Sequence, residues 1–201
     1  MAPETQGRTR PLLVVISGPS GSGKTTITNR LIARNADFRL SVSATTRAPR
    51  PGEVDGRDYL FTSREKFRAE IRQGGFLEHS EHFGHLYGTP RKPVEDALAK
   101  GKIAVLEIDV NGARQAKASL AGRVGTLLIF INAPSAEELR RRILQRPGTQ
   151  DDQVARERLA RAEMEVAQSR FFDREVLNDD VEKAVEQVEN LIRMEAGKSN
   201  G

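Results

Sequence analysis

The residues with the clearest chemical potential lie in the stretch SGPSGSGKTT, at positions 17–26. From Gly18 to Thr25 it fits the pattern G-x-x-x-x-G-K-S/T, between an apolar run and a segment of helical periodicity, as this pattern requires. Glycines let backbone N–H groups converge on an anion, lysine reaches the terminal phosphates, and the threonine hydroxyl faces Mg²⁺. The stretch therefore predicts a nucleoside triphosphate site made of Gly18, Pro19, Ser20, Gly21, Ser22, Gly23, Lys24, Thr25 and Thr26.

A pair of arginines further along the chain indicates a second anion site. Arg47 and Arg50 lie three residues apart. Pro49 and Pro51 bias the backbone there toward an extended conformation, so the two planar guanidinium groups can converge on one phosphate. The same arrangement is compatible with solvated surface charge, and the arginines alone do not name the acceptor.

Four more motifs narrow the choice. SATTRAPRPGEVDGRDYLF, GGFLEHSEHFGHLYGTPR, LEIDVNGA and VLNDD follow the glycine-rich stretch in this order. Together they resemble the guanylate kinase family, from Leu12 to about Ile192. The resemblance implies transfer of the γ-phosphoryl group of ATP to GMP, with Mg²⁺ as cofactor, in purine nucleotide metabolism.

The resemblance also implies how GMP is bound. Ser43, Tyr59 and Tyr87 match positions that hydrogen-bond its phosphate, and Thr89 matches the position that reads O6 of guanine. Glu78 is expected to select the base, because guanine offers N1–H and an amine side by side whereas adenine has an acceptor at N1. The implied GMP site comprises Ser43, Arg47, Arg50, Tyr59, Glu78, Tyr87, Thr89, Glu107 and Asp109.

Two acidic residues, Glu107 and Asp109, end the apolar run IAVLEID. An acidic residue at this point can hold the water of a metal ion or approach the acceptor. The resemblance places Glu107 near guanine and Asp109 near the phosphates, so Thr25 and Asp109 are the expected metal ligands. Glu107 has the equally good alternative of capping the strand.

An arginine-rich segment, 135–165, is implied to form a lid over the triphosphate that spreads charge in the transition state. The implied catalytic residues are Lys24, Arg47, Arg142, Arg146 and Arg158. The other arginines match no family position and are expected on a solvated helix face: Arg140, Arg141, Arg156 and Arg161. Asn178 either lies near a nucleotide base or caps the next helix.

Two positions depart from the family pattern. His79 follows Glu78 where an aromatic residue is common, and Leu86 stands where a second tyrosine is common. Neither is assigned to the chemistry, so we expect them to alter packing and affinity.

The elements that position these residues are indicated by hydrophobic periodicity. Apolar runs at 12–16, 39–44, 103–108, 126–131 and 175–177 alternate with segments of helical periodicity, which predicts an α/β P-loop fold in three layers with a mostly parallel five-stranded sheet. The expected units are a core (11–40, 92–134 and 166–195), a GMP-binding insertion (41–91), the lid (135–165) and flexible tails (1–10 and 196–201).

Composition limits the remaining possibilities. The chain has no cysteine and three histidines, so disulfides and a thiolate or histidine zinc site are not expected. No apolar run is long enough for a membrane span or signal peptide, which predicts a cytoplasmic protein without a membrane partner. A net charge of +4 suits small phosphorylated anions, and the basic residues lack the interleaved aromatics expected of a nucleic-acid binder. A homo-oligomer stays open.

Other functions remain to be separated by experiment. The motif N-K-x-D does not occur, which disfavours a GTPase switch. A related kinase of a phosphorylated sugar has no use for a base-reading Glu78 and Thr89. A non-catalytic interaction module of the guanylate kinase type has no use for Lys24 and Thr25.

Overall fold

The computed structural model describes residues 11–82, 84–145 and 152–197. Arg146, one of the arginines expected over the triphosphate, lies outside these ranges, as do the expected tail 1–10 and residues 198–201 of the expected C-terminal tail. In the part of the chain that is described, no helix combines the length and the hydrophobicity that crossing a bilayer requires.

Five strands, all parallel, form the central sheet in the order β2-β7-β1-β8-β9. This confirms the fold class that the spacing of apolar runs predicts. β1 occupies the middle, so the glycine-rich stretch that follows it emerges at the centre of the sheet's carboxyl edge. The strands are β1 (Leu12–Ser17), β2 (Phe38–Leu40), β7 (Ile103–Glu107), β8 (Gly125–Asn132) and β9 (Arg174–Leu177).

The run at 39–44, predicted as one strand, is instead divided between two sheets. β2 ends at Leu40, and the N–H of Ser41 donates to Val105 O at 2.9 Å before the chain leaves the central sheet. Ala44 begins β3 (Ala44–Thr45) of a second sheet. The prediction was wrong because an apolar run shows that a segment is buried without showing which sheet buries it.

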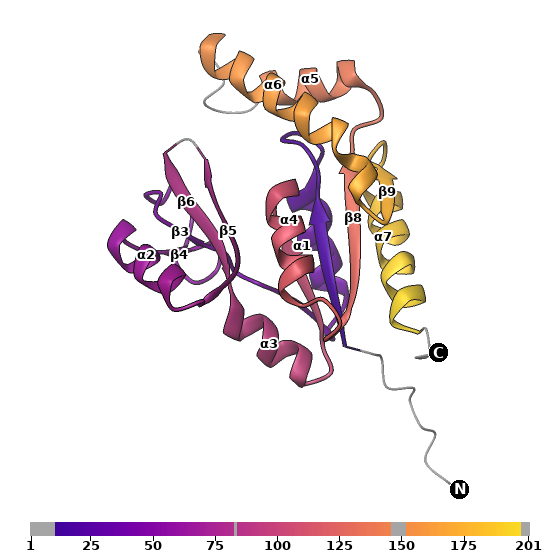
Figure 1. Cartoon of the computed structure of the whole chain (residues 1–201). Helices are drawn as coiled ribbons and strands as arrows, with labels where there is room; N and C mark the ends of the chain where they lie inside the picture. The colour runs from indigo at the N-terminus through magenta and orange to yellow at the C-terminus, as the bar shows by residue number, and fades with distance from the viewer. Residues whose placement is uncertain (1–10, 83, 146–151, 198–201) are drawn as a thin grey trace, which may run out of the picture.

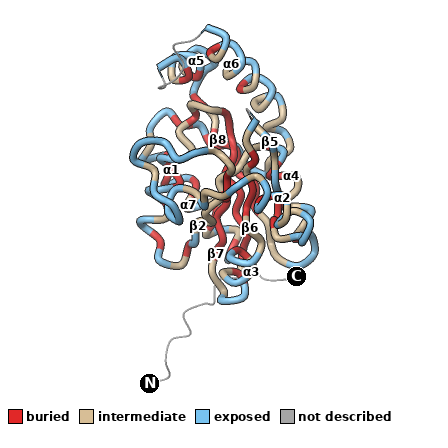
Figure 2. The backbone as a smooth tube through the Cα atoms, turned by 90° about the vertical axis from the view of Figure 1, so that its left-hand side faces the viewer, coloured by how far each residue is buried: buried red, intermediate tan, exposed pale blue. Residues whose placement is uncertain are grey.

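Helices cover both faces of the central sheet, which gives three layers (Figures 1 and 2). One face carries α1 (Lys24–Arg34) and α7 (Val181–Ala196), and the other carries α3 (Arg91–Ala99) and α4 (Val110–Ser119). Side chains of β1 alternate between the two cores, with Leu12, Val14 and Ile16 on one side and Leu13 and Val15 on the other. Each such fully buried side chain contributes about 1.5–3 kcal/mol to folding, so β1 is rigid where the site begins.

A second sheet, ordered β4-β3-β6-β5, stands beside the core. Its other elements are β4 (Leu60–Phe61), α2 (Arg64–Arg72), β5 (Phe76–His82) and β6 (His85–Pro90). Phe67 of α2 and Phe76 stack with ring centroids 4.4 Å apart. Helix α4 holds this sheet to the core, because Ser119 Oγ donates to Leu77 O at 2.8 Å and the Gln115 amide exchanges two hydrogen bonds with the backbone of β5.

The arginine-rich segment forms α5 (Ala136–Leu144) and α6 (Asp152–Ala167), followed by a single 3₁₀ turn, η1 (Ser169–Phe171). Ser135 caps α5 by accepting from the N–H of Glu138 at 3.1 Å. Leu139 and Ile143 of α5 pack on Ala162 of α6, so the two helices share a small core of their own. They lie beyond the carboxyl edge of the central sheet, above the glycine-rich stretch (Figure 1).

Candidate active site

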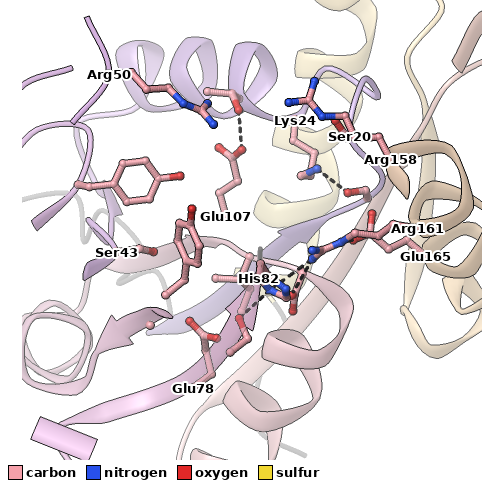
Figure 3. A pocket seen from close by; sticks show the side chains of 18 of the residues that line it. Ser20, Lys24, Ser43, Arg50, Glu78, His82, Glu107, Arg158, Arg161 and Glu165 are labelled. Carbon is pink, nitrogen blue, oxygen red and sulfur yellow. Dashed lines mark hydrogen bonds and ion pairs between the residues drawn. The ribbon is translucent and has the colours of Figure 1, made fainter. Parts of the chain in front are cut away.

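A cleft of about 830 Å³ opens where the central sheet, the second sheet and α6 meet. Its lining comes from the glycine-rich stretch, the β5–β6 hairpin, the segment after β7 and α6, as Figure 3 shows. It lies outside the carboxyl ends of the parallel strands, where α/β sheets place their ligands. The fold therefore brings most of the sequence-predicted site residues to one cavity: Gly18, Ser20, Lys24, Thr25, Ser43, Arg50, Tyr59, Glu78, Tyr87, Glu107, Asp109 and Arg158.

Two glycines of the glycine-rich loop occupy positions where a side chain is sterically excluded. Gly18 has φ 144°, and a Cβ there would lie 2.0 Å from Ile131 O. Gly23 has φ 90° and precedes the first turn of α1, whose backbone N–H groups point out of the helix N-terminus. Lys24 Nζ donates to Gly18 O and to Pro19 O, the latter at 3.1 Å. This arrangement is a cradle for a polyphosphate.

A smaller cavity of about 260 Å³ adjoins the same loop and contains Arg142. The guanidinium of Arg142 donates to Glu138 Oε1 at 2.7 Å and to Asn178 O at 3.2 Å. Arg142 therefore connects α5 to the segment after β9, while Arg158 of α6 lines the main cleft. The remaining lining of the smaller cavity is Pro19, Gly21, Gly23, Lys24, Thr25 and Thr26.

Asn178 is buried, with 2% of its surface exposed, and fixes the loop from behind. Its Nδ2 donates to Ser22 O at 2.8 Å, and a Cβ on Gly23 would lie 2.1 Å from that same Nδ2. The next helix is capped by Asp180, which accepts from Lys183 N at 2.9 Å. The helix-capping alternative for Asn178 is therefore wrong.

Glu107 ends β7 and Asp109 follows it, and the two carboxylates face different partners, in the opposite order to the expectation. Thr25 Oγ1 donates to Glu107 Oε1 at 2.6 Å, which puts Glu107 on the phosphate side of the cleft. Asp109 lies beside Glu78, since a Cβ on Gly112 would meet Glu78 Oε2 at 2.6 Å and Asp109 Oδ1 at 3.3 Å. Register explains the reversal: Glu107 is still paired beside β1, whereas Asp109 caps α4, which packs on β5.

Glu78 is buried at the far end of the cleft, with 4% of its surface exposed. Thr89 Oγ1 donates to Glu78 Oε1 at 2.6 Å. Burial, and secondarily the nearby charge of Asp109, raise the pKa of Glu78 to about 7. A carboxylate in this setting accepts two hydrogen bonds from a planar ligand edge that is rich in donors.

The paired arginines are arranged by Glu53. Arg47 donates to Glu53 Oε1 at 2.8 Å, and its guanidinium lies 5.4 Å from the ring centroid of Tyr59. Glu53 Oε2 accepts from the backbone N–H of Arg50 at 2.7 Å, and the Arg50 side chain lines the cleft with Ser43. Figure 3 shows Arg50 on the side of the cleft opposite Glu78. Glu53 thus joins the Arg47 guanidinium to the Arg50 backbone, and of the two predicted arginines it is Arg50 that lines the cleft.

Arg161 was expected on a solvated helix face, and that expectation is wrong. It is half-buried and lines the cleft, where its guanidinium donates to Asp109 Oδ2 at 3.3 Å and to Glu165 at 3.0 Å. Arg140, Arg141 and Arg156 are exposed, as expected. Arg161 lies on the side of α6 that faces the cleft. Helical periodicity alone does not identify that side, because charged residues occupy several faces of this helix.

Sequence reasoning also missed Ser80, His82 and Glu165, all of which line the cleft. A signal for the first two exists, because Ser80 and His82 follow Glu78 at intervals of two along β5 and so share its side of the strand. Glu165 follows Arg161 by one helical turn. His82 Nε2 pairs with Asp109 Oδ2, and Ser80 Oγ lies 2.8 Å from that nitrogen.

The two departures from the family pattern lie outside the lining. Leu86 is buried in the core of the second sheet with Ala44, Phe67 and Phe76. His79 is exposed, and its backbone N–H donates to Gln115 at 3.1 Å. Leu86 therefore serves packing of the second sheet, and position 79 contacts α4 through its backbone, which leaves the histidine side chain without a structural explanation.

Comparisons with known proteins agree on one family. The family model described as guanylate kinase matches residues 9–195. A guanylate kinase of Rubrobacter xylanophilus is 49% identical over 184 residues, 92% of this chain and 94% of that protein, and one of Parasynechococcus marenigrum is 48% identical over 180 residues, 90% and 97% of the two chains. The crystal structure of guanylate kinase from Anaplasma phagocytophilum matches with a TM-score of 0.76 at 36% identity, covering 95% of this chain and 88% of that one.

Proposed function

The chain belongs to the guanylate kinase family, and from this premise we propose that it transfers the γ-phosphoryl group of ATP to GMP, giving ADP and GDP. The observation that carries the proposal is the pairing of two features in one cleft. A glycine-built anion cradle lies at one end, and the buried carboxylate of Glu78 lies at the other. Arg50 lines the same cleft and is available to bind the phosphate of GMP, which accepts the transferred group.

The reaction needs positioning and charge neutralisation more than proton transfer. A phosphate monoester, with a second pKa near ~6, is already mostly a dianion at neutral pH and attacks without a general base. Lys24 and the arginines stabilise charge on the phosphoryl group as it moves in line from ATP to GMP. Exclusion of water by the second sheet and by α5 and α6 prevents wasteful hydrolysis.

Thr25 and Glu107 are the residues that fit Mg²⁺ best. Their side-chain oxygens lie 2.6 Å apart beside the phosphate cradle, and hard oxygen ligands suit this ion. Within the described residues no cluster of three or more His, Cys, Asp or Glu side chains is arranged to hold a metal, which agrees with an ion held chiefly by phosphates and water. When bound, Mg²⁺ neutralises charge on the transferring phosphates. Asp109, expected as a ligand, is engaged by His82 and Arg161.

The test is a coupled assay of ADP release, supplied with Mg²⁺-ATP and one acceptor at a time. We expect turnover with GMP at least ~10³-fold above that with AMP, because a buried carboxylate loses its partners when it faces adenine. UMP, CMP and ribose phosphates are the other acceptors. Preference for a ribose phosphate would favour the sugar-kinase alternative, and no turnover of any acceptor would favour a non-catalytic interaction module.

GMP affinity is expected to fall by about tenfold between pH 8 and pH 6, because Glu78, with a pKa of about 7, must be ionised to accept the guanine donors. The sign follows from competition: below pH 7 a proton occupies the oxygen that guanine needs. Titration calorimetry with GMP alone measures the effect. The phosphate of GMP also titrates in this range, so Glu78→Gln is the control, and the difference between the two profiles should vanish if Glu78 does not contact the base.

We further propose a cytoplasmic location and a place in purine nucleotide metabolism, with ATP and GMP as small-molecule partners. Membership of the family supports both statements. The oligomeric state is left to measurement by sedimentation.

A further inference from the structure

Three parts of the fold meet at the carboxylate of Asp109. Oδ2 pairs with His82 Nε2 from the end of β5 and with the Arg161 guanidinium from α6, the latter at 3.3 Å. Oδ1 accepts from the N–H of Gly112 at 2.7 Å, at the start of α4. Figure 3 shows Arg161 and His82 directed toward each other across the cleft, and their nearest nitrogens are 3.3 Å apart.

Arg161, Asp109 and His82 together form a bridge between α6 and β5. The two side chains that pair with Asp109 are each anchored on their own element. Arg161 donates to Glu165, one turn further along α6, at 3.0 Å. His82 has Ser80 Oγ at 2.8 Å, and its ring lies 5.9 Å from that of Tyr87. The side chains of His82, Asp109 and Arg161 are at most 30% exposed, so the pairing is partly shielded from solvent and salt.

The bridge affects the base-reading residue, because Asp109 is the neighbouring charge of Glu78. His82 Nε2, the N–H of Gly112 and the guanidinium of Arg161 all contact the Asp109 carboxylate. Asp109 is therefore a fixed anion beside a second carboxylate that must also be ionised to bind guanine. A guanidinium on Asp109 offsets the repulsion between the two carboxylates.

We propose that Arg161 and His82 are positioning residues for the guanine site, which hold Asp109 beside Glu78 and thereby join α6 to the second sheet when GMP is bound. The inference rests on the proposed function. It concerns two residues that pair with Asp109, and it predicts that α6 contributes to binding of the acceptor as well as of ATP. The bridge should strengthen GMP binding even without ATP.

The test compares Arg161→Ala, His82→Phe, the double variant, and Arg156→Ala as a control on the exposed face of the same helix. GMP binding is measured by calorimetry without ATP, and KM for each substrate by the coupled assay. We expect Arg161→Ala and His82→Phe each to weaken GMP binding by about tenfold, with KM for ATP changed less than about twofold. Arg161→Lys, which keeps the charge, should recover part of the loss.

The double variant distinguishes a shared bridge from separate effects. Because both side chains act through one carboxylate, the double variant should lose about as much GMP affinity as the more severe single variant. Independent effects would instead multiply to a loss of about a hundredfold. The inference is overturned if Arg161→Ala behaves like Arg156→Ala, if the two losses multiply, or if KM for ATP rises as much as KM for GMP. Melting temperatures of all variants identify any loss of folding. Absence of GMP turnover by the unmodified protein would instead overturn the proposed function.

Discussion

Replacing Lys24 by methionine is expected to reduce kcat by about a thousandfold while leaving GMP affinity within about a factor of two. Methionine keeps most of the side-chain stem and removes the ammonium that Lys24 presents beside the carbonyl oxygens of Gly18 and Pro19. That charge is needed most when negative charge moves between phosphates. The residues proposed to bind GMP lie chiefly in or beside the second sheet, so we expect its binding not to change.

The measurement pairs the coupled ADP-release assay with GMP calorimetry, and Lys183→Met serves as the control. Lys183 is an exposed lysine in the first turn of α7, away from the cleft. A kcat for Lys24→Met close to that of Lys183→Met would contradict the assignment of the glycine-rich loop to the transferred phosphate. An equal loss of GMP affinity would show instead that the loop shapes both sites.

The parts of this fold that could be predicted from the sequence depend on local patterns. The continuous apolar run of β1, which includes Leu13 and Val14, indicates a strand buried on both faces. The Gly18–Thr25 motif combines glycines, which allow unusual backbone conformations, with the positive charge of Lys24. Both features can be recognised without knowledge of the rest of the chain. These local signals suffice for the central sheet and for the phosphate cradle.

The parts that could not be predicted depend on long-range geometry. Glu107 and Asp109 are two residues apart, and which of them faces Thr25 is decided by the neighbouring strand β1 and by the packing of α4 on β5. Arg161 resembles its exposed neighbour Arg156 in sequence, and only the orientation of α6 distinguishes them. The sequence pattern assigns Ala44 to the same strand as Arg39 and Leu40, but in the structure Ala44 is buried in the separate core of the second sheet.

Replacing Glu78 by glutamine is expected to lower kcat/KM for GMP by about a hundredfold and to raise the relative use of AMP. A glutamine amide presents one acceptor and one donor, so one of the two adjacent guanine donors meets an N–H in place of an oxygen. Adenine, whose N1 is an acceptor, is penalised less by the same amide. Because Glu78 is 4% exposed, water cannot repair the mismatch, and Thr89 offers a single hydroxyl that already bonds Oε1.

The matched control is Glu81→Gln, on the same strand three residues further along. Glu81 is exposed and pairs with Arg64 at 2.7 Å, an ion pair at the surface that contributes little to stability. If Glu78→Gln keeps the kcat/KM values of the unmodified protein for GMP and AMP, guanine is read elsewhere in the cleft. If both acceptors lose activity equally, Glu78 supports the structure of the second sheet rather than the choice of base. Only a loss for GMP that exceeds the loss for AMP agrees with a carboxylate that reads two donors, because guanine presents those donors at N1 and its 2-amino group, whereas adenine has an acceptor at N1 and no 2-amino group.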